Sequence, residues 1–301
     1  MLRLIADSGS TKTDWTLLYS PIPNVPYEVI ATFRTQGITP IHQGPADIRQ
    51  ILANELQPQL SAFPRVKLVD SKVLESTLMQ HCHIYFYGSG CTPAHVPMVK
   101  QVLAEVLSPQ SVEVYSDLMA AARALCGHDA GIACILGTGA NSCLYDGEQI
   151  VQNTPALGYI LGDEGSGSVL GRLFLNAIFK NPQLSALRDT YLAENKLTQA
   201  DIIRKVYNEP MANRFLATTS PFILHHLDNM IVQRLVIDNF RHFFRSNIEP
   251  YGHHDLPVHF VGSMAHHYRE QLEQAAKEEG YIVGNTMQSP MEGLIAYHNL
   301  P

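Results

Sequence analysis

The sequence predicts an α/β protein made of two related halves, and three observations lead to this prediction. An apolar strand, a turn of small residues and a second strand form a pattern at 2–19, and the same pattern returns at 131–145, about 130 residues later. Apolar segments at 83–87, 112–115 and 258–261 each end in small or polar residues that predict a turn. After each turn the apolar residues recur at helical spacing, as in α/β folds. The 301 residues are 46% hydrophobic, enough for substantial cores.

The first half alternates apolar runs, which predict strands, with segments of helical periodicity. The spacing of Ile48, Ile51 and Leu52 predicts a helix, and Thr92 and Pro93 suit the N-cap and first position of another. We therefore expect strands at Leu2–Ala6, Trp15–Tyr19, Tyr27–Arg34, His83–Tyr87 and Val112–Tyr115, and helices at Ala46–Leu56, from Thr92 to Leu107, and at Leu118–Leu125.

The second half begins with a hairpin and then becomes mostly helical. Apolar residues at helical spacing predict one long buried helix over Pro221–Asn247. The remaining expected elements are strands at Gly131–Leu136, Ser142–Tyr145, Val258–Val261 and Tyr281–Val283, and a helix at Met291–His298. We expect a first domain at 1–115 and a second at 116–287 that carries the helical insertion, with a helix at about 288–301 packing back on the first.

Composition excludes several classes of partner. A net charge of −7 disfavours nucleic acid and anionic membrane as main partners, and no apolar span reaches transmembrane length. The five cysteines form no C-x-x-C pair, and a strand starts almost at once, so we expect a cytoplasmic protein with reduced thiols. The fourteen histidines lack metal-ligand spacing, and the apolar helical middle suggests a homodimer.

The turn between the first two strands has the composition of an anion-binding loop. Its Gly and Ser residues let backbone N–H groups approach an anion, and the hydroxyls at Ser8, Ser10 and Thr11 with the Lys12 ammonium would face it. Asp7 could hold Mg²⁺ beside the anion. The turn is not a Walker loop, because G-x-x-x-x-G-K-[ST] and the strand-to-helix context are both absent.

Further turns at strand ends could join this one, because ligands gather at the carboxyl ends of strands in α/β folds. These turns are Gly88–Cys91, Gly137–Asn141 and Gly262-Ser263, and 158–167 opens a helix. Asp117 follows a strand at the start of a helix, where it is either a helix cap or a general base. Gly262-Ser263 could equally cap the helix that follows.

The motifs together resemble a known family. In chain order they are D-x-G-x-T-K-T from Asp7, G-x-G-C from Gly88, S-D-x-x-x-A-A from Ser116, G-T-G-x-N from Gly137, G-D-E-G-S-G from Gly162 and V-G-S from Val261. This set, which runs through essentially the whole chain, resembles the N-acetylglucosamine kinase-like branch of the BadF/BadG/BcrA/BcrD ATPase family. That family belongs to the superfamily of sugar kinases, heat-shock ATPases and actin.

The resemblance implies two ribonuclease H-like domains that close around ATP and an amino sugar, with an interdomain cleft. It implies Asp117 as the catalytic base and Asp7 as a Mg²⁺ ligand through water. The implied ATP contacts are Ser8, Gly9, Ser10, Thr11, Lys12, Gly137, Thr138, Gly139, Gly262 and Ser263, and the implied sugar contacts are Thr39, Asn141, Gly158 and Asp163. The expected reaction is ATP-dependent formation of N-acetylglucosamine 6-phosphate.

Two positions depart from the family pattern, and both are on the sugar side. Thr39 stands where the family usually has Asn, and Leu157 stands where it often has Trp. N-acetylmuramic acid and glucosamine therefore remain alternative substrates. A sensor that binds sugar or nucleotide without turnover is a second possibility, and a dehydratase activator, whose shared iron–sulfur cluster the cysteine spacing does not fit, is a third.

Overall fold

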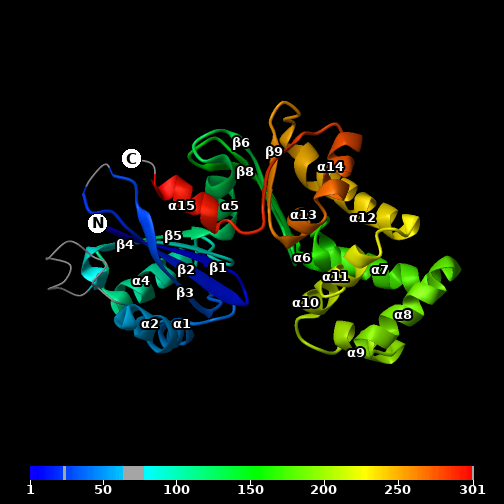
Figure 1. Cartoon of the computed structure of the whole chain (residues 1–301), viewed down its shortest axis with the longest axis horizontal. Helices are drawn as coiled ribbons and strands as arrows, with labels where there is room; N and C mark the ends of the chain where they lie inside the picture. The colour runs from blue at the N-terminus through cyan, green and yellow to red at the C-terminus, as the bar shows by residue number, and fades with distance from the viewer. Residues whose placement is uncertain (23–24, 64–77, 300–301) are drawn as a thin grey trace. The chain divides into compact units, whose positions relative to one another are not determined.

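The computed structural model describes residues 1–22, 25–63 and 78–299, and the chain divides into two compact units. Unit 1 comprises Met1–Gly127 and Pro290–Pro301, and unit 2 comprises His128–Ser289 (Figure 1). The division falls after Gly127, later than the expected boundary, because the helix that starts at Asp117 packs within unit 1. Each unit is a mixed five-stranded sheet flanked by helices, which confirms the predicted fold class.

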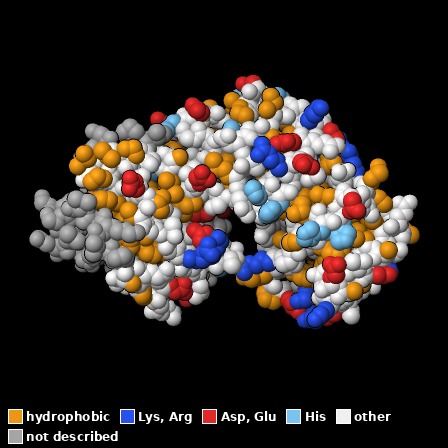
Figure 2. All heavy atoms as spheres, in the orientation of Figure 1, with side chains coloured by type: hydrophobic (Ala, Val, Ile, Leu, Met, Phe, Trp, Pro, Cys, Tyr) orange, Lys and Arg blue, Asp and Glu red, His pale blue; other side chains and the backbone are white. Residues whose placement is uncertain are grey.

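The surface carries charges of both signs. Figure 2 shows acidic and basic side chains interspersed on the face that it presents. All five cysteines are buried, and none belongs to a disulfide. Within the described residues, no helix combines the length and the hydropathy that crossing a bilayer requires.

The sheet of unit 1 has the strand order β3-β2-β1-β4-β5. The strands are β1 (Leu2–Ser8), β2 (Lys12–Tyr19), β3 (Glu28–Gln36), β4 (Cys82–Gly88) and β5 (Ser111–Ser116). β2 runs antiparallel to both of its neighbours, whereas β1, β4 and β5 run parallel. The carboxyl ends of the three parallel strands therefore meet at one edge of the sheet, where Ser8 pairs with Gly88 and Gly88 with Ser116.

Helices cover both faces of this sheet. Leu4 and Ala6 pack on one face with α1 (Pro45–Ile51), the π-helical η1 (Leu52–Leu56), α2 (Gln57–Ala62) and α4 (Val96–Leu107). Ile5 faces the other side, where α5 (Asp117–Cys126) and α15 (Met291–Asn299) lie. α4 begins later than predicted, because His95 rather than Thr92 occupies the N-cap position.

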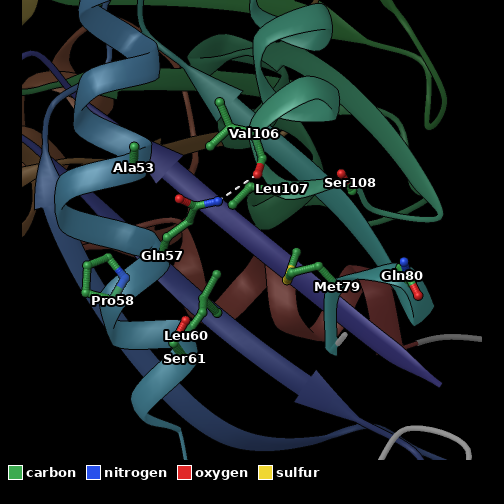
Figure 3. A pocket seen from close by; sticks show the side chains of 10 residues that line it. All are labelled: Ala53, Gln57, Pro58, Leu60, Ser61, Met79, Gln80, Val106, Leu107 and Ser108. Carbon is green, nitrogen blue, oxygen red and sulfur yellow. Dashed lines mark hydrogen bonds between the residues drawn. The ribbon is translucent and has the colours of Figure 1, made fainter. Parts of the chain in front are cut away.

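A cavity of about 610 Å³ opens on the side of unit 1 that η1, α2 and α4 cover (Figure 3). Residues from η1, α2, the end of α4 and the 3₁₀ turn η3 (Leu78–His81) line it, and the Gln57 amide donates to the Val106 carbonyl, 2.8 Å away. Among the described residues that line it, none is ionisable or belongs to the predicted site. The cavity therefore offers no acid, base or cation for chemistry.

Unit 2 repeats the sheet topology of unit 1. Its order β10-β9-β6-β7-β8 places an antiparallel meander beside two parallel strands, as in the first sheet. The strands are β6 (Gly131–Leu136), β7 (Ala140–Tyr145), β8 (Ile150–Thr154), β9 (Val258–Val261) and β10 (Val283–Met287). The repeat confirms that the chain consists of two related halves.

The helical part of unit 2 differs from the prediction at one point. The expected helix over 221–247 is broken, because α11 (Ser220–His225) ends before Asn229, whose side chain caps α12 (Met230–Phe243). The other elements are α6 (Gly158–Leu161), α7 (Gly167–Lys180), η4 (Pro182–Leu184), α8 (Ser185–Asn195), α9 (Gln199–Tyr207), α10 (Ala212–Ala217), η5 (Phe244–Ile248), η6 (Glu249–Tyr251), α13 (Ser263–His267) and α14 (Arg269–Glu278).

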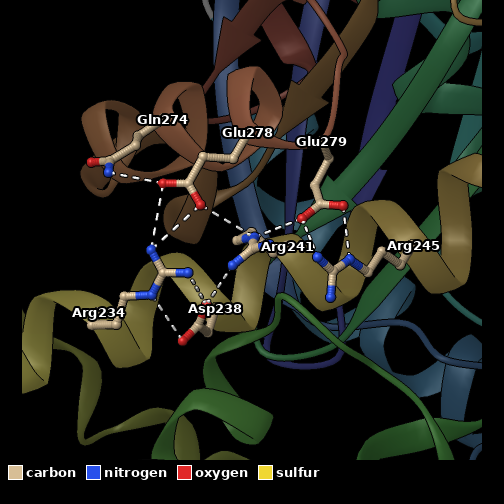
Figure 4. A network of polar contacts seen from close by, with 7 residues as sticks. All are labelled: Arg234, Asp238, Arg241, Arg245, Gln274, Glu278 and Glu279. Atoms are coloured by element: carbon tan, nitrogen blue, oxygen red, sulfur yellow. Dashed lines mark hydrogen bonds and ion pairs between the residues drawn. The ribbon is translucent and has the colours of Figure 1, made fainter.

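An ionic network ties α12 and η5 to α14 (Figure 4). The carboxylate of Glu279, just after α14, accepts from Arg241 at 2.6 Å and from Arg245 at 2.7 Å. These hydrogen bonds lower the pKa of Glu279. The network joins α12 and α14 at the surface, and the apolar sides of both helices belong to the core of unit 2.

Candidate functional site

The predicted site residues fall into two groups, one in each unit, and each group lies at the carboxyl edge of its own sheet. Asp7, the turn Gly9–Lys12, Thr39 and Asp117 belong to unit 1. The second turn, Asn141, Gly158, Asp163 and Gly262-Ser263 belong to unit 2. Asp117 was expected in the second domain and lies in the first unit instead.

The first turn links β1 and β2 and is fixed by buried hydrogen bonds beneath it. The Gly9 N–H donates to the Lys12 carbonyl at 3.0 Å. Ser8 is buried, and its hydroxyl lies 2.6 Å from that of Thr13. The same hydroxyl donates to the Ile38 carbonyl and accepts from the Ile38 N–H. This differs from the expectation that Ser8 faces an anion, because its hydroxyl already serves to hold the turn.

Gly37 braces the same loop from the other side. Its N–H donates to the Thr11 carbonyl at 3.1 Å. A Cβ at this position would lie 2.3 Å from the Gly9 carbonyl oxygen and 2.8 Å from the Thr11 nitrogen. Only glycine therefore lets the two backbone segments pack at this distance.

We predict that Gly37→Ala destabilises unit 1 by about 1–3 kcal/mol and weakens nucleotide binding, because the added methyl group must displace backbone of the turn. Trp15 is the single tryptophan of the chain and is fully buried in unit 1, so its fluorescence reports unfolding of that unit. Gly44→Ala is the matched control, since its Cβ would meet nothing closer than an Asp47 oxygen at 3.7 Å. Equal unfolding midpoints for the two variants would contradict the bracing role.

Lys12 carries a charge that is already paired. Its ammonium lies 2.5 Å from an Asp14 oxygen, and Arg34 donates to the same carboxylate at 2.7 Å. Burial raises the pKa of Asp14, but the hydrogen bonds from Lys12 and Arg34 outweigh it and leave that pKa below its usual value. Lys12 is half exposed, so it lies at the rim of the turn as one member of an ion-pair network.

Asp7 lies near the end of β1 in a strongly acidic environment. Burial and the negative charges of Asp14 and Asp117 raise its pKa to about 6, against the opposing effect of Lys12. A carboxylate held among other carboxylates gains most from a cation beside it. The described residues contain no group of three or more His, Cys, Asp or Glu that could hold a metal. One acidic side chain still fits Mg²⁺ that arrives with phosphate oxygens and water as its other ligands.

Asp117 is the first residue of α5, but the N-cap is Ser116. The Ser116 hydroxyl accepts from the Met119 N–H at 3.2 Å. The Asp117 carboxylate accepts from the Leu118 N–H at 2.9 Å and from the Ser89 hydroxyl. Burial raises its pKa despite these hydrogen bonds. The capping function thus rests with Ser116, and Asp117 is a partly buried carboxylate close enough to Asp7 to affect its pKa.

Ser89 was not among the predicted residues, although it connects the parts of this site. Its N–H donates to the Ser8 carbonyl at 2.9 Å, and its hydroxyl donates to Asp117. The only signal in the sequence was its place in the turn Gly88–Cys91 after a buried strand. Thr39 is also buried near this edge, with its methyl group 3.3 Å from the position of a Cβ at Gly90. Among the described residues its hydroxyl finds no hydrogen-bond partner.

The second turn is held by the start of α7. Amides of Gly167 and Ser168 donate to the carbonyls of Gly137 and Thr138 at 2.8 and 3.1 Å. Gly137 has open space where a Cβ would be, so the backbone of the turn is accessible on that side. This arrangement leaves the turn rigid and its surface approachable by an anion.

Asp163 lies against this turn. Its Oδ2 is 3.1 Å from the position of a Cβ at Gly139, and the Ala140 N–H donates to its carboxylate. Burial raises the pKa of Asp163, and its backbone is left-handed with φ of 54°. A strained, non-glycine backbone that presents a carboxylate is typical of functional positions.

Gly262 closes the edge beside the second turn. Its φ is 124°, and a Cβ would lie 2.3 Å from the Leu136 carbonyl oxygen. α13 begins at Ser263, and its N-cap residue, Gly262, has no side chain that could bond the first amides of the helix. Both residues therefore sit directly beside the end of β6, from which the turn starts.

The two remaining predicted sugar residues, Asn141 and Gly158, also belong to unit 2. Asn141 accepts from the Ser142 N–H at 2.9 Å and from the Asn153 amide at 3.0 Å. Gly158 begins α6 with φ of 75°, and the neighbouring Leu157, Ile160 and Leu161 are exposed. Leu157 thus offers an apolar surface to solvent.

Comparison with solved structures places the chain in a known class. Neither a family model nor a curated protein matches it. A crystal structure from Porphyromonas gingivalis, provisionally assigned as an N-acetylglucosamine kinase, is 46% identical over 98% of both chains with a TM-score of 0.85. One from Chromobacterium violaceum with the same provisional assignment has 19% identity, 98% coverage of both chains and a TM-score of 0.70, and it shows the fold alone.

The repeated sheet, with a turn at the carboxyl edge of each half, defines the actin-like ATPase fold. Within that class, the chain belongs to the N-acetylglucosamine kinase-like branch of the BadF/BadG/BcrA/BcrD ATPase family.

Proposed function

We propose that this protein transfers the γ-phosphoryl group of ATP to an amino sugar, with N-acetylglucosamine as substrate and the 6-phosphate as product. The observation that carries the proposal is the state of Asp117. Ser116 is the N-cap of α5, so the Asp117 carboxylate does not occupy the N-cap position, and it lies at the edge that also carries Asp7 and the first turn. The 46% identity to the Porphyromonas gingivalis protein supports the same activity.

The reaction follows from positioning and electrostatics. Asp117 accepts the proton of the sugar hydroxyl as its oxygen forms a bond to the γ-phosphorus, and the bond from that phosphorus to the bridging oxygen breaks to release ADP. Within each unit, the glycine-containing turn, Gly9–Lys12 or Gly137–Gly139, offers backbone that suits phosphate oxygens. Mg²⁺ held near Asp7 would neutralise charge on the phosphates. The raised pKa of Asp117 suits a group that must take up a proton during the reaction.

The proposed sugar contacts are Thr39 in unit 1 and, in unit 2, Asn141, Gly158 and Asp163. Asp163 can accept hydrogen bonds from sugar hydroxyls, and the unpartnered Thr39 hydroxyl is a buried group that gains from a polar ligand. Exposed Leu157 provides an apolar rather than an aromatic surface. These features keep N-acetylmuramic acid and glucosamine as rival substrates.

A substrate panel tests the choice of sugar. ADP release with Mg-ATP should be stimulated by N-acetylglucosamine, with a kcat/KM at least about tenfold above those for glucosamine and N-acetylmuramic acid. A higher kcat/KM for either rival would reassign the substrate. Tight sugar binding without ADP release would favour the non-catalytic sensor, which the Thr39 and Leu157 departures leave as the second candidate.

A further inference from the structure

We infer that a hydrogen-bonded chain of side chains, Arg123–Tyr87–His298, positions Asp117 by locking α5 to β4 and to the C-terminal helix α15. The inference rests on the proposed function, because it concerns the base of that reaction. None of the three residues has a predicted contact with sugar or nucleotide. Figure 1 shows α15 beside α5 in unit 1.

The three side chains form a directed chain of hydrogen bonds. Arg123, on α5, donates from Nη1 to the Tyr87 hydroxyl at 2.8 Å, and that hydroxyl lies 2.8 Å from His298 Nε2 on α15. Arginine can only donate, so the single proton of Tyr87 is left for His298. Donation from Tyr87 to His298 requires the neutral tautomer of His298 with Nε2 unprotonated. Burial, with the charges of Arg123 and Arg3, lowers the pKa of His298 to about 3, so the chain persists at physiological pH.

Aromatic rings hold the Arg123 guanidinium in place. Its central carbon lies 4.0 Å from the ring centre of Tyr115 on β5 and 5.0 Å from that of Tyr297 on α15. The cation is therefore fixed between the sheet and the C-terminal helix by contacts that tolerate little displacement.

α15 is itself anchored at both ends. Near its start, a Cβ at Gly293 would lie 2.3 Å from the Ala124 carbonyl oxygen, so the two helices touch backbone to backbone. At its end, the Asn299 side chain exchanges hydrogen bonds with the backbone N–H and carbonyl of Tyr27. The helix therefore acts as a strap across one face of the unit 1 sheet.

Strand β4 connects this lock to Asp117. Tyr87 holds the Arg123 end of α5, and Ser89, two residues further, donates to the Asp117 carboxylate at the beginning of α5. Tyr87 at the end of β4 and Ser89 in the turn after it therefore bond to the two ends of α5. A displacement of about 1 Å in a catalytic group can reduce turnover on the order of a hundredfold.

Tyr87→Phe tests the inference, because it removes one hydroxyl and keeps the buried ring. We expect kcat to fall about tenfold or more while the KM for ATP changes by less than about twofold. The matched control is Tyr145→Phe in unit 2, which loses a buried hydroxyl bond of 2.9 Å to the Gly147 carbonyl and should leave kcat unchanged. His298→Gln, which keeps an acceptor, should retain more of kcat than His298→Leu.

A wild-type kcat in Tyr87→Phe, or an equal loss in Tyr145→Phe, would overturn the inference. Amide hydrogen exchange at Leu118 and Met119 separates this outcome from a failure of the proposed function, because it needs no turnover. Faster exchange in Tyr87→Phe than in wild type and Tyr145→Phe supports the lock even if no sugar is phosphorylated, and unchanged exchange contradicts it.

Discussion

Replacing Asp117 with asparagine is expected to lower kcat by about 10²–10⁴-fold while nucleotide affinity stays close to that of the wild type. Asparagine keeps the size of the side chain and an oxygen for the Leu118 N–H, but it cannot accept a proton from the sugar. The negative charge near Asp7 is also removed, so the pKa of Asp7 should fall towards its usual value. Steady-state kinetics and titration with an ATP analogue measure the two effects separately.

Ser116→Ala provides the comparison for this variant. It removes the cap bond to Met119 and should cost about 1 kcal/mol in unfolding free energy without abolishing transfer. Asp117→Asn should behave in the opposite way, with little loss of stability and a large loss of kcat. Retained turnover in Asp117→Asn would show that the carboxylate is not the base.

Replacing Asp7 with asparagine is expected to stabilise unit 1 and to impair binding of the magnesium nucleotide. The pKa of Asp7 is about 6 in the folded protein against 3.8 as its ordinary value. The folded state thus binds the proton more tightly, so the wild type loses stability as pH rises from about 4 to 6, and the cost is fully present above pH 6. Asparagine avoids this cost, which at 1.36 kcal/mol per pKa unit is about 1–3 kcal/mol at pH 7.5.

Trp15 fluorescence during urea unfolding at pH 4 and pH 7.5 measures this gain, which should be present at pH 7.5 and absent at pH 4. Asp14→Asn is the matched control, and it should lower the unfolding free energy at pH 7.5. The reason is that the pKa of Asp14 is lowered and its charge is paired with Lys12 and Arg34. We expect Asp7→Asn to weaken Mg-ATP binding about tenfold or more. A destabilised variant at pH 7.5, or one with unaltered Mg-ATP affinity, would contradict the role of Asp7.

The elements that the sequence predicted well are those in which local pattern and tertiary packing agree. Both hairpins and the helix that starts near Asp117 appear close to their expected bounds, because apolar runs between small-residue turns have few other solutions. The break before Asn229 was missed, because apolar spacing continues through it and hides the cap. The last strand is Val283–Met287 rather than Tyr281–Val283, since its half-exposed residues show little apolar alternation.

The site was harder to predict where function depends on contacts between distant segments. Ser8 resembled an anion contact in the sequence, but thirty residues separate it from Ile38, to which its hydroxyl is committed. Gly37 and Ser89 act through backbone contacts with the first turn that no local pattern encodes. The distinction between Ser116 as the N-cap and Asp117 as the first helical residue, with its carboxylate bonded to Leu118 and Ser89, also required the structure, because either residue suits the start of a helix.

Phosphorus NMR of the reaction of wild-type protein with Mg-ATP and N-acetylglucosamine tests the central claim most directly. We predict loss of the ATP signals and the appearance of ADP together with one new phosphomonoester signal, coupled to the two protons on carbon 6 of the sugar. Unchanged ATP with each sugar of the panel, or ADP formed with inorganic phosphate and no sugar ester, would contradict the proposal that this protein is an amino-sugar kinase.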